Sequence, residues 1–187
     1  MRKLIVSEFI SVDGVMEAPG GEPGFKHSGW VGELFDEGWL AYKLNEVLEA
    51  EAHLLGRVTY ESFAGAWPTR TGEFAEKVNA MPKYVVSATL DRLDWSNSHL
   101  LKGDPIAAIA ALKQGDGGPL LIAGSRTLVQ ALYPTDLVDE YRLMVFPVIL
   151  GSGRRLFPDR AADKRALKLA ETKALGSGVV VNTYRPA

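Results

Sequence analysis

The stretch "GPLLIAGSRTLVQALY", residues 118–133, decides the fold class that the sequence predicts. Its apolar run from Leu120 to Ala123 does not alternate with polar residues, which is typical of a strand covered on both faces in a parallel sheet. Gly124 and Ser125 then predict a tight turn, and a helix is expected to begin near Arg126. A buried strand that leads directly into a helix is the repeating unit of an α/β fold.

The rest of the chain extends this pattern in both directions. Strands are expected at 4–10, 52–55, 83–90, 99–101, 120–123, 140–150, 166–174 and 179–184, and helices at 31–50, 57–64, 71–80, 105–113 and from 126. Strands and helices alternate first, and only strands follow. This order predicts a mixed, mostly parallel sheet with helices on both faces and a C-terminal antiparallel hairpin.

Composition narrows the class of protein. The 187 residues suit one domain over 1–187, with 47% hydrophobic and 24% charged residues. A net charge of −2 argues against nucleic-acid binding, and the absence of cysteine removes disulfides and thiolate metal sites. Three scattered histidines lack metal-ligand spacing, so no metal site is expected. No apolar stretch is long enough to span a membrane and no signal peptide is recognisable, so a cytoplasmic protein is expected.

Two strand-to-helix turns carry residues that bind anions. "HLLGRVTYESF", residues 53–63, places Gly56, Arg57 and Thr59 at a strand end, and the turn at Gly124 repeats this geometry. Ser87 and Thr89 follow a third strand. Because strand carboxyl ends share one edge of a parallel sheet, these groups are expected to lie together around a phosphate. The alternatives are a structural turn that binds nothing and an Arg57 that is a solvated surface charge.

The long Gly/Pro-rich loop over 11–24 is expected to be functional. Its Asp13 and Glu17 are candidate proton donors, although Asp13 before a glycine is also typical of a turn. The aromatic residues Trp30, Phe35 and Trp67 are candidates for a substrate pocket, and core packing is the alternative for each of them.

Taken together, the motifs resemble the dihydrofolate reductase fold, and within it the reductase domain of bacterial riboflavin biosynthesis. The resemblance covers nearly the whole chain and implies a three-layer α/β domain. Five segments carry it in the family's order: "SVDGVME", "LLGRVTYESF", "VVSATL", "IAGSRTLVQAL" and "DEYRLMVFPVILGSGRRLF". The sequence departs from the family in having Ala88 where relatives often carry a cation, and in lacking the zinc deaminase domain often fused to the riboflavin enzyme.

The resemblance implies an NADPH-dependent reductase that transfers a hydride to a small polar substrate, for which a heterocycle is one class. The nearest known activity is that of 5-amino-6-(5-phosphoribosylamino)uracil reductase. The implied cofactor-binding residues come from all five segments and are Val12, Gly14, Val15, Gly56, Arg57, Val58, Thr59, Val86, Ser87, Thr89, Ala123, Gly124, Ser125, Arg126, Thr127, Leu128, Gly151 and Gly153. A homodimer is also implied. The alternatives are a nucleotide-binding protein without turnover and a structural dimer that has kept only the fold.

Overall fold

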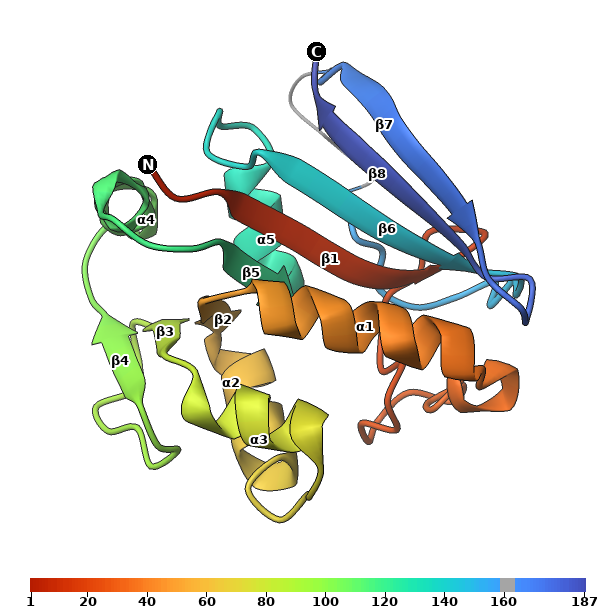
Figure 1. The fold of residues 1–187 in the computed structure, drawn as a ribbon, viewed down its shortest axis with the longest axis horizontal. Coiled ribbons are helices and arrows are strands. Elements are labelled where there is room, and N and C mark those ends of the chain that lie inside the picture. Colours follow the sequence, from red (N-terminus) through yellow and green to blue (C-terminus); the bar gives the residue numbers. More distant parts are fainter. Residues whose placement is uncertain (159–163) are drawn as a thin grey trace.

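An eight-stranded sheet organises the described part of the chain, which comprises residues 1–158 and 164–187 of a computed structural model (Figure 1). The strand order across the sheet is β4-β3-β2-β5-β1-β6-β8-β7. The strands are β1 (Leu4–Ser11), β2 (Ala52–Gly56), β3 (Lys83–Val86), β4 (Ser98–Leu101), β5 (Leu120–Ala123), β6 (Glu140–Phe146), β7 (Leu167–Ala174) and β8 (Val180–Pro186).

Strands β1 to β6 are mutually parallel, whereas β8 runs antiparallel to β6 and β7 runs antiparallel to β8. The hairpin β7–β8 therefore closes one end of the sheet (Figure 1). The predicted fold class is confirmed, including the mostly parallel sheet and the antiparallel C-terminal hairpin.

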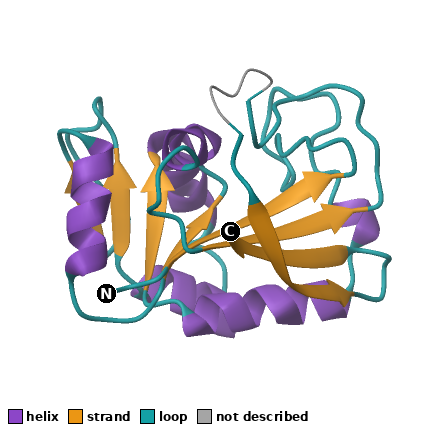
Figure 2. Cartoon of the chain, turned by 90° about the horizontal axis from the view of Figure 1, so that it is seen from above, coloured by secondary structure: helices purple, strands orange, loops and turns teal. Residues whose placement is uncertain are grey.

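Helices cover both faces of the sheet, because successive side chains of each buried strand point to opposite sides. Leu4 and Val6 of β1 belong to one buried cluster, and Ile5 between them belongs to another. The helices α1 (Glu37–Glu49), α2 (Arg57–Ala66) and α3 (Glu73–Ala80) pack on the Ile5 side, and α4 (Pro105–Gln114) and α5 (Arg126–Leu132) on the other. Figure 2 shows helices on both sides of the twisted sheet. No helix in the described residues is long and apolar enough to cross a membrane.

Most predicted elements agree with the structure to within two residues at each end, and three differ by more. The helix expected over 31–50 is broken, since Phe35 is extended between a 3-10 turn (Gly32–Leu34) and α1, and Asp36 caps α1 by accepting from two backbone N–H groups. The strand expected over 83–90 ends at Val86, because the Ser87 hydroxyl accepts the N–H groups of the next turn. The strand expected over 140–150 ends at Phe146, directly before a proline.

Candidate functional site

A cavity of about 440 Å³ lies where the neighbouring strands β3, β2 and β5 end. Both α2 and α5 begin at this edge of the sheet, directly after β2 and β5. The lining residues come from these strand ends, the two helices, α4 and one later loop: Gly56, Arg57, Val58, Thr59, Val86, Ser87, Ala88, Thr89, Pro105, Ser125, Arg126, Thr127, Leu128, Ala131 and Arg154. The volume is that of a pocket for a small molecule or cofactor. The three turns that the sequence singled out therefore do meet.

Two helix N-termini without side-chain caps lie at this cavity. Gly56, which has no side chain, precedes α2, and Ser125 precedes α5 without accepting a hydrogen bond from the first turn of that helix through its hydroxyl. The first backbone N–H groups of an α-helix have no partner within the helix, and they carry the positive end of its dipole. Arg126 and Thr127, in the first turn of α5, therefore present N–H groups suited to an anion.

The two turns are joined by a pair of reciprocal hydrogen bonds. The Ser125 N–H donates to Thr59 Oγ1 at 2.8 Å, and the Gly56 N–H donates to Ser125 Oγ at 2.9 Å. Gly124 and Ser125 both have positive φ, at 71° and 59°, which turns the chain sharply from β5 into α5. A left-handed serine is uncommon, and such backbone strain is frequent at ligand sites.

One expectation for this turn needs correction. The resemblance implies that Gly124, Ser125, Arg126 and Thr127 all bind the cofactor, and a strand-to-helix turn of this kind would offer a phosphate their backbone N–H groups. The Gly124 N–H instead donates to Glu8 Oε2 at 2.9 Å, and the Ser125 N–H is taken by Thr59. Only the N–H groups of Arg126 and Thr127 are left for a ligand in this geometry.

Glu8, which the sequence motifs did not single out, is the buried carboxyl group beneath the turn. Its side chain is on β1, which is paired with β5, and the residue is 3% exposed. Burial raises the pKa of Glu8 well above its ordinary value, and this outweighs the opposite effect of the hydrogen bond from Gly124. Its other oxygen, Oε1, has no hydrogen-bond partner in the described structure. Burial, the unpartnered Oε1 and the raised pKa therefore all favour the protonated form of Glu8. The signal in the sequence was an acidic residue inside an otherwise apolar strand.

Three arginines line the cavity, and each has a partner. Arg57 pairs with Glu61 at 2.8 Å and Arg126 donates to Gln130 at 3.3 Å, in both cases one helical turn away. Arg154 pairs instead with Glu17, a residue of the first loop, with 3.3 Å between Nε and Oε1. Arg57 and Arg126 were predicted from the sequence, whereas Arg154 was not, although it directly follows the turn "GSG".

The third strand end forms the wall of the cavity next to β3. Val86, Ser87, Ala88 and Thr89 all line it. The Ser87 hydroxyl accepts the N–H groups of Thr89 and Leu90, at 3.1 and 3.0 Å, so it shapes this turn. A hydroxyl can still donate while it accepts, so Ser87 remains able to bind a ligand oxygen.

The two candidate proton donors of the first loop are both engaged. Asp13 accepts from the Ser11 hydroxyl at 2.7 Å and from the N–H groups of Leu150 and Gly151. The Ser11 hydrogen bond is the main cause that lowers the pKa of Asp13 to about 2. An ionised carboxylate of this kind is a poor acid, so the geometry favours the turn interpretation of Asp13. Glu17 accepts from Arg154, both from its backbone N–H and from its side chain.

Several residues proposed for the cofactor do not line this cavity: Val12, Gly14, Val15, Ala123, Gly124, Gly151 and Gly153. Ala123 and Gly124 lie beside it at the end of β5. Val15 is buried and forms a β-bridge with Arg155. A Cβ on Gly153 would lie 2.6 Å from Val15 Cγ1, so this glycine allows the two loops to pack closely. Contact of these residues with a nicotinamide stays a prediction.

The three aromatic residues proposed for a substrate pocket lie in two separate clusters. Trp30 is buried edge-on against Phe146, with 5.4 Å between ring centroids, and Phe35 is exposed beside Trp39. Trp67 stacks on Phe74, at 5.1 Å, in a different hydrophobic cluster. The structure therefore does not bring Trp67 together with Trp30, and the core interpretation fits Trp30.

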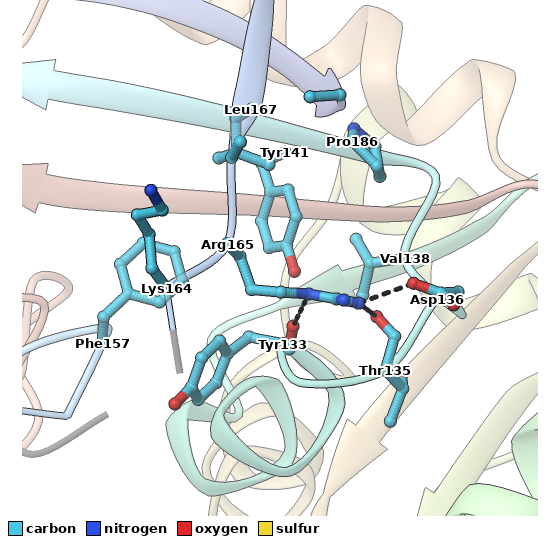
Figure 3. A pocket seen from close by; sticks show the side chains of 12 residues that line it. Tyr133, Thr135, Asp136, Val138, Tyr141, Phe157, Lys164, Arg165, Leu167 and Pro186 are labelled. Atoms are coloured by element: carbon cyan, nitrogen blue, oxygen red, sulfur yellow. Dashed lines mark hydrogen bonds and ion pairs between the residues drawn. The ribbon is translucent and has the colours of Figure 1, made fainter. Parts of the chain in front are cut away.

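A second cavity, also of about 440 Å³, lies where β6 begins and β8 ends (Figure 3). Figure 3 shows Arg165 reaching across it toward Tyr133, Thr135 and Asp136. Tyr141, at the start of β6, also lines it. Ligands of open parallel sheets bind at the carboxyl ends of the strands. The first cavity is therefore the stronger candidate site.

The fold and the position of the cavity define a class, the α/β proteins with a dihydrofolate reductase-like fold. Residues 2–181 match the model of the RibD C-terminal domain, so the chain belongs to that family. Two Bacillus subtilis (strain 168) proteins, the uncharacterized YyaP and YwjB, are each 28% identical to it. The matches cover 98% of this chain in both cases, with 94% of YyaP and 98% of YwjB.

Solved structures support the fold. A crystal structure from Shewanella sp. PV-4, provisionally named a riboflavin biosynthesis protein, has a TM-score of 0.74 at 22% identity, and 99% of each chain is covered. RibD of Acinetobacter baumannii has a TM-score of 0.67 at 14% identity, where the match covers the whole of this chain and 58% of RibD.

Proposed function

We propose that this protein is an NADPH-dependent reductase that transfers a hydride to a small polar substrate, with a heterocycle of the riboflavin-precursor type as one class. The observation that carries the proposal is the cavity at the carboxyl ends of β2, β3 and β5. Two uncapped helix N-termini and three arginines surround it. Such an arrangement attracts phosphates, and a dinucleotide supplies several.

The residues at the cavity fit the cofactor that the family implies. Arg126 and Thr127 would bind a phosphate through their backbone N–H groups, and Arg57 through its guanidinium. Val86 and Ser87, on the wall next to β3, would contact the adenosine. The nicotinamide supplies the hydride when it is bound. Because Asp13 is ionised and hydrogen-bonded, proton delivery through water fits the site better than delivery by this carboxylate.

An assay of NADPH oxidation with a panel of small carbonyl, imine and pyrimidine compounds tests the proposal. Turnover of at least one compound, with an oxidised nicotinamide product, is expected. Tight NADPH binding without turnover of any compound would favour the alternative, a nucleotide-binding protein without catalysis. Absence of NADPH binding would contradict both.

We also propose a homodimer that forms at strand β7. This strand ends the sheet order, and all eight of its residues are exposed, including Leu167 and Leu169. An exposed edge strand with apolar side chains is prone to pair with another chain, and a second copy of this protein would cover it.

A further inference from the structure

Arg154 lies on a loop that is attached to the first loop of the chain. The Met16 N–H donates to the Arg154 carbonyl at 2.9 Å, and the Leu156 N–H donates to the Gly14 carbonyl at 3.2 Å. Val15 and Arg155 form an antiparallel bridge between these two bonds. A shift of the Arg154 backbone therefore acts directly on the first loop.

Glu17 connects the side chain of Arg154 to the same loop. One carboxylate oxygen of Glu17 lies 3.3 Å from Arg154 Nε, and the other accepts the Arg154 N–H at 2.8 Å. The carbonyl of Glu17 accepts from the indole of Trp30, which is buried in the core. Glu17 thus contacts Arg154 at the cavity through its carboxylate and Trp30 of the buried aromatic cluster through its carbonyl.

We propose that Arg154 is a phosphate-binding residue of the cavity, and that Glu17 is a positioning residue that competes with the bound phosphate for its guanidinium. The proposal rests on the proposed binding of NADPH. The Arg154 side chain is 66% exposed, and ion pairs of such exposed groups are weak because water screens them. A phosphate can bind the guanidinium fork through two hydrogen bonds and with more charge. Nucleotide binding would therefore draw Arg154 away from Glu17 and loosen the first loop.

The other two arginines of the cavity differ in one respect. The partners of Arg57 and Arg126 are Glu61 and Gln130, which lie on the same helix as their arginine. If a phosphate replaced Glu61 or Gln130 as the partner of its arginine, only side chains on the surface of that one helix would move. Arg154 and Glu17 belong to two loops that are 137 residues apart in the chain. Among the three arginines described at the cavity, Arg154 alone has its partner on the first loop, residues 11–24.

A double-mutant cycle tests the proposal, with the dissociation constant of NADPH measured by titration calorimetry. Arg154→Ala should weaken NADPH by about tenfold, the effect of one charge-assisted contact. Glu17→Gln keeps the shape and an acceptor oxygen but removes the competing charge, so it should tighten NADPH by about threefold. In the Arg154→Ala background the gain from Glu17→Gln should disappear. Arg165→Ala, which removes a paired arginine at the second cavity, is the matched control and should leave the affinity unchanged.

The outcomes separate this inference from the proposed function. If the wild type does not bind NADPH, the proposed function fails, and this inference fails with it. If the wild type binds NADPH and Arg154→Ala binds it equally well, only the inference is overturned. An equal gain from Glu17→Gln with and without Arg154 would show a long-range charge effect in place of competition, and would also overturn it.

Discussion

Glu8 shows how strongly the fold can change the chemistry of one side chain. In solution a glutamate is ionised at neutral pH, but burial between β1 and the turn at Gly124 raises its pKa. Lys43 and Glu46 of α1 act on it through the sheet in opposite directions. In the protonated form that burial favours, Glu8 places no negative charge beneath the turn at Gly124.

The pH dependence of stability tests this assignment. The unfolded chain loses the Glu8 proton near its ordinary pKa, whereas the folded chain loses it only at higher pH, so the wild type should lose stability as pH rises above about 4.5. In the Glu8→Gln variant, the free energy of unfolding should fall less steeply with rising pH, because this titrating group is absent. The free energy of unfolding, measured with urea between about pH 5 and about pH 8, gives the comparison. Glu33→Gln, at an exposed position, is the control, and equal slopes in wild type and Glu8→Gln would contradict the assignment.

At the scale of elements, the turn from β5 into α5 depends on Gly124. A Cβ at this position would lie 3.1 Å from both Cγ2 and Oγ1 of Thr59. It would also strain a backbone with φ of 71°. Because Thr59 Oγ1 accepts the Ser125 N–H, a displaced Thr59 would disturb both the turn before α2 and the turn before α5.

Two alanine variants separate strain from crowding. Gly103→Ala has the same kind of strain, since φ is 86°, but open space around its Cβ. It should lose about 1 kcal/mol of stability and bind NADPH normally. Gly124→Ala should lose more, about 2–3 kcal/mol, and should bind NADPH more weakly. Thermal unfolding and NADPH titration measure both effects, and equal behaviour of the two variants would refute the role of Thr59.

The helices and strands also show how far the fold could be predicted from the sequence. The order of strands and helices was predictable, because long apolar runs and glycine turns mark each element. Helix 31–50 was predicted in one piece, since the apolar spacing passes through Phe35 and Asp36 without a visible break. Arg154 could not be placed at the cavity, because its position depends on hydrogen bonds to a loop near the other end of the chain.

For the whole molecule, the exposed strand β7 leads to a prediction about assembly. Leu169 is 57% exposed at the edge of the sheet, so Leu169→Lys should place a charge in the proposed dimer contact and give monomers. Leu48→Lys, on α1, changes an exposed leucine of another surface and should leave the dimer intact. Light scattering after size exclusion measures both masses. A monomeric wild type, or a dimeric Leu169→Lys variant, would contradict the proposal.

The central claim is that the cavity at the ends of β2, β3 and β5 binds NADPH through its phosphates. NADPH differs from NADH by one phosphate on the adenosine ribose, and Arg57 lies at the cavity together with Ser87 and Thr89. A charge-assisted hydrogen bond contributes roughly 1.5–3 kcal/mol, and about 1.4 kcal/mol corresponds to tenfold in affinity.

The most direct measurement is therefore the dissociation constants of NADPH and NADH for the wild type and for Arg57→Ala. We expect the wild type to bind NADPH more tightly than NADH. Arg57→Ala should weaken NADPH by roughly ten- to a hundredfold and NADH much less. Equal losses for both would mean that Arg57 holds the phosphates the two cofactors share. A wild type that binds neither cofactor, or an Arg57→Ala variant that binds both as the wild type does, would contradict the claim.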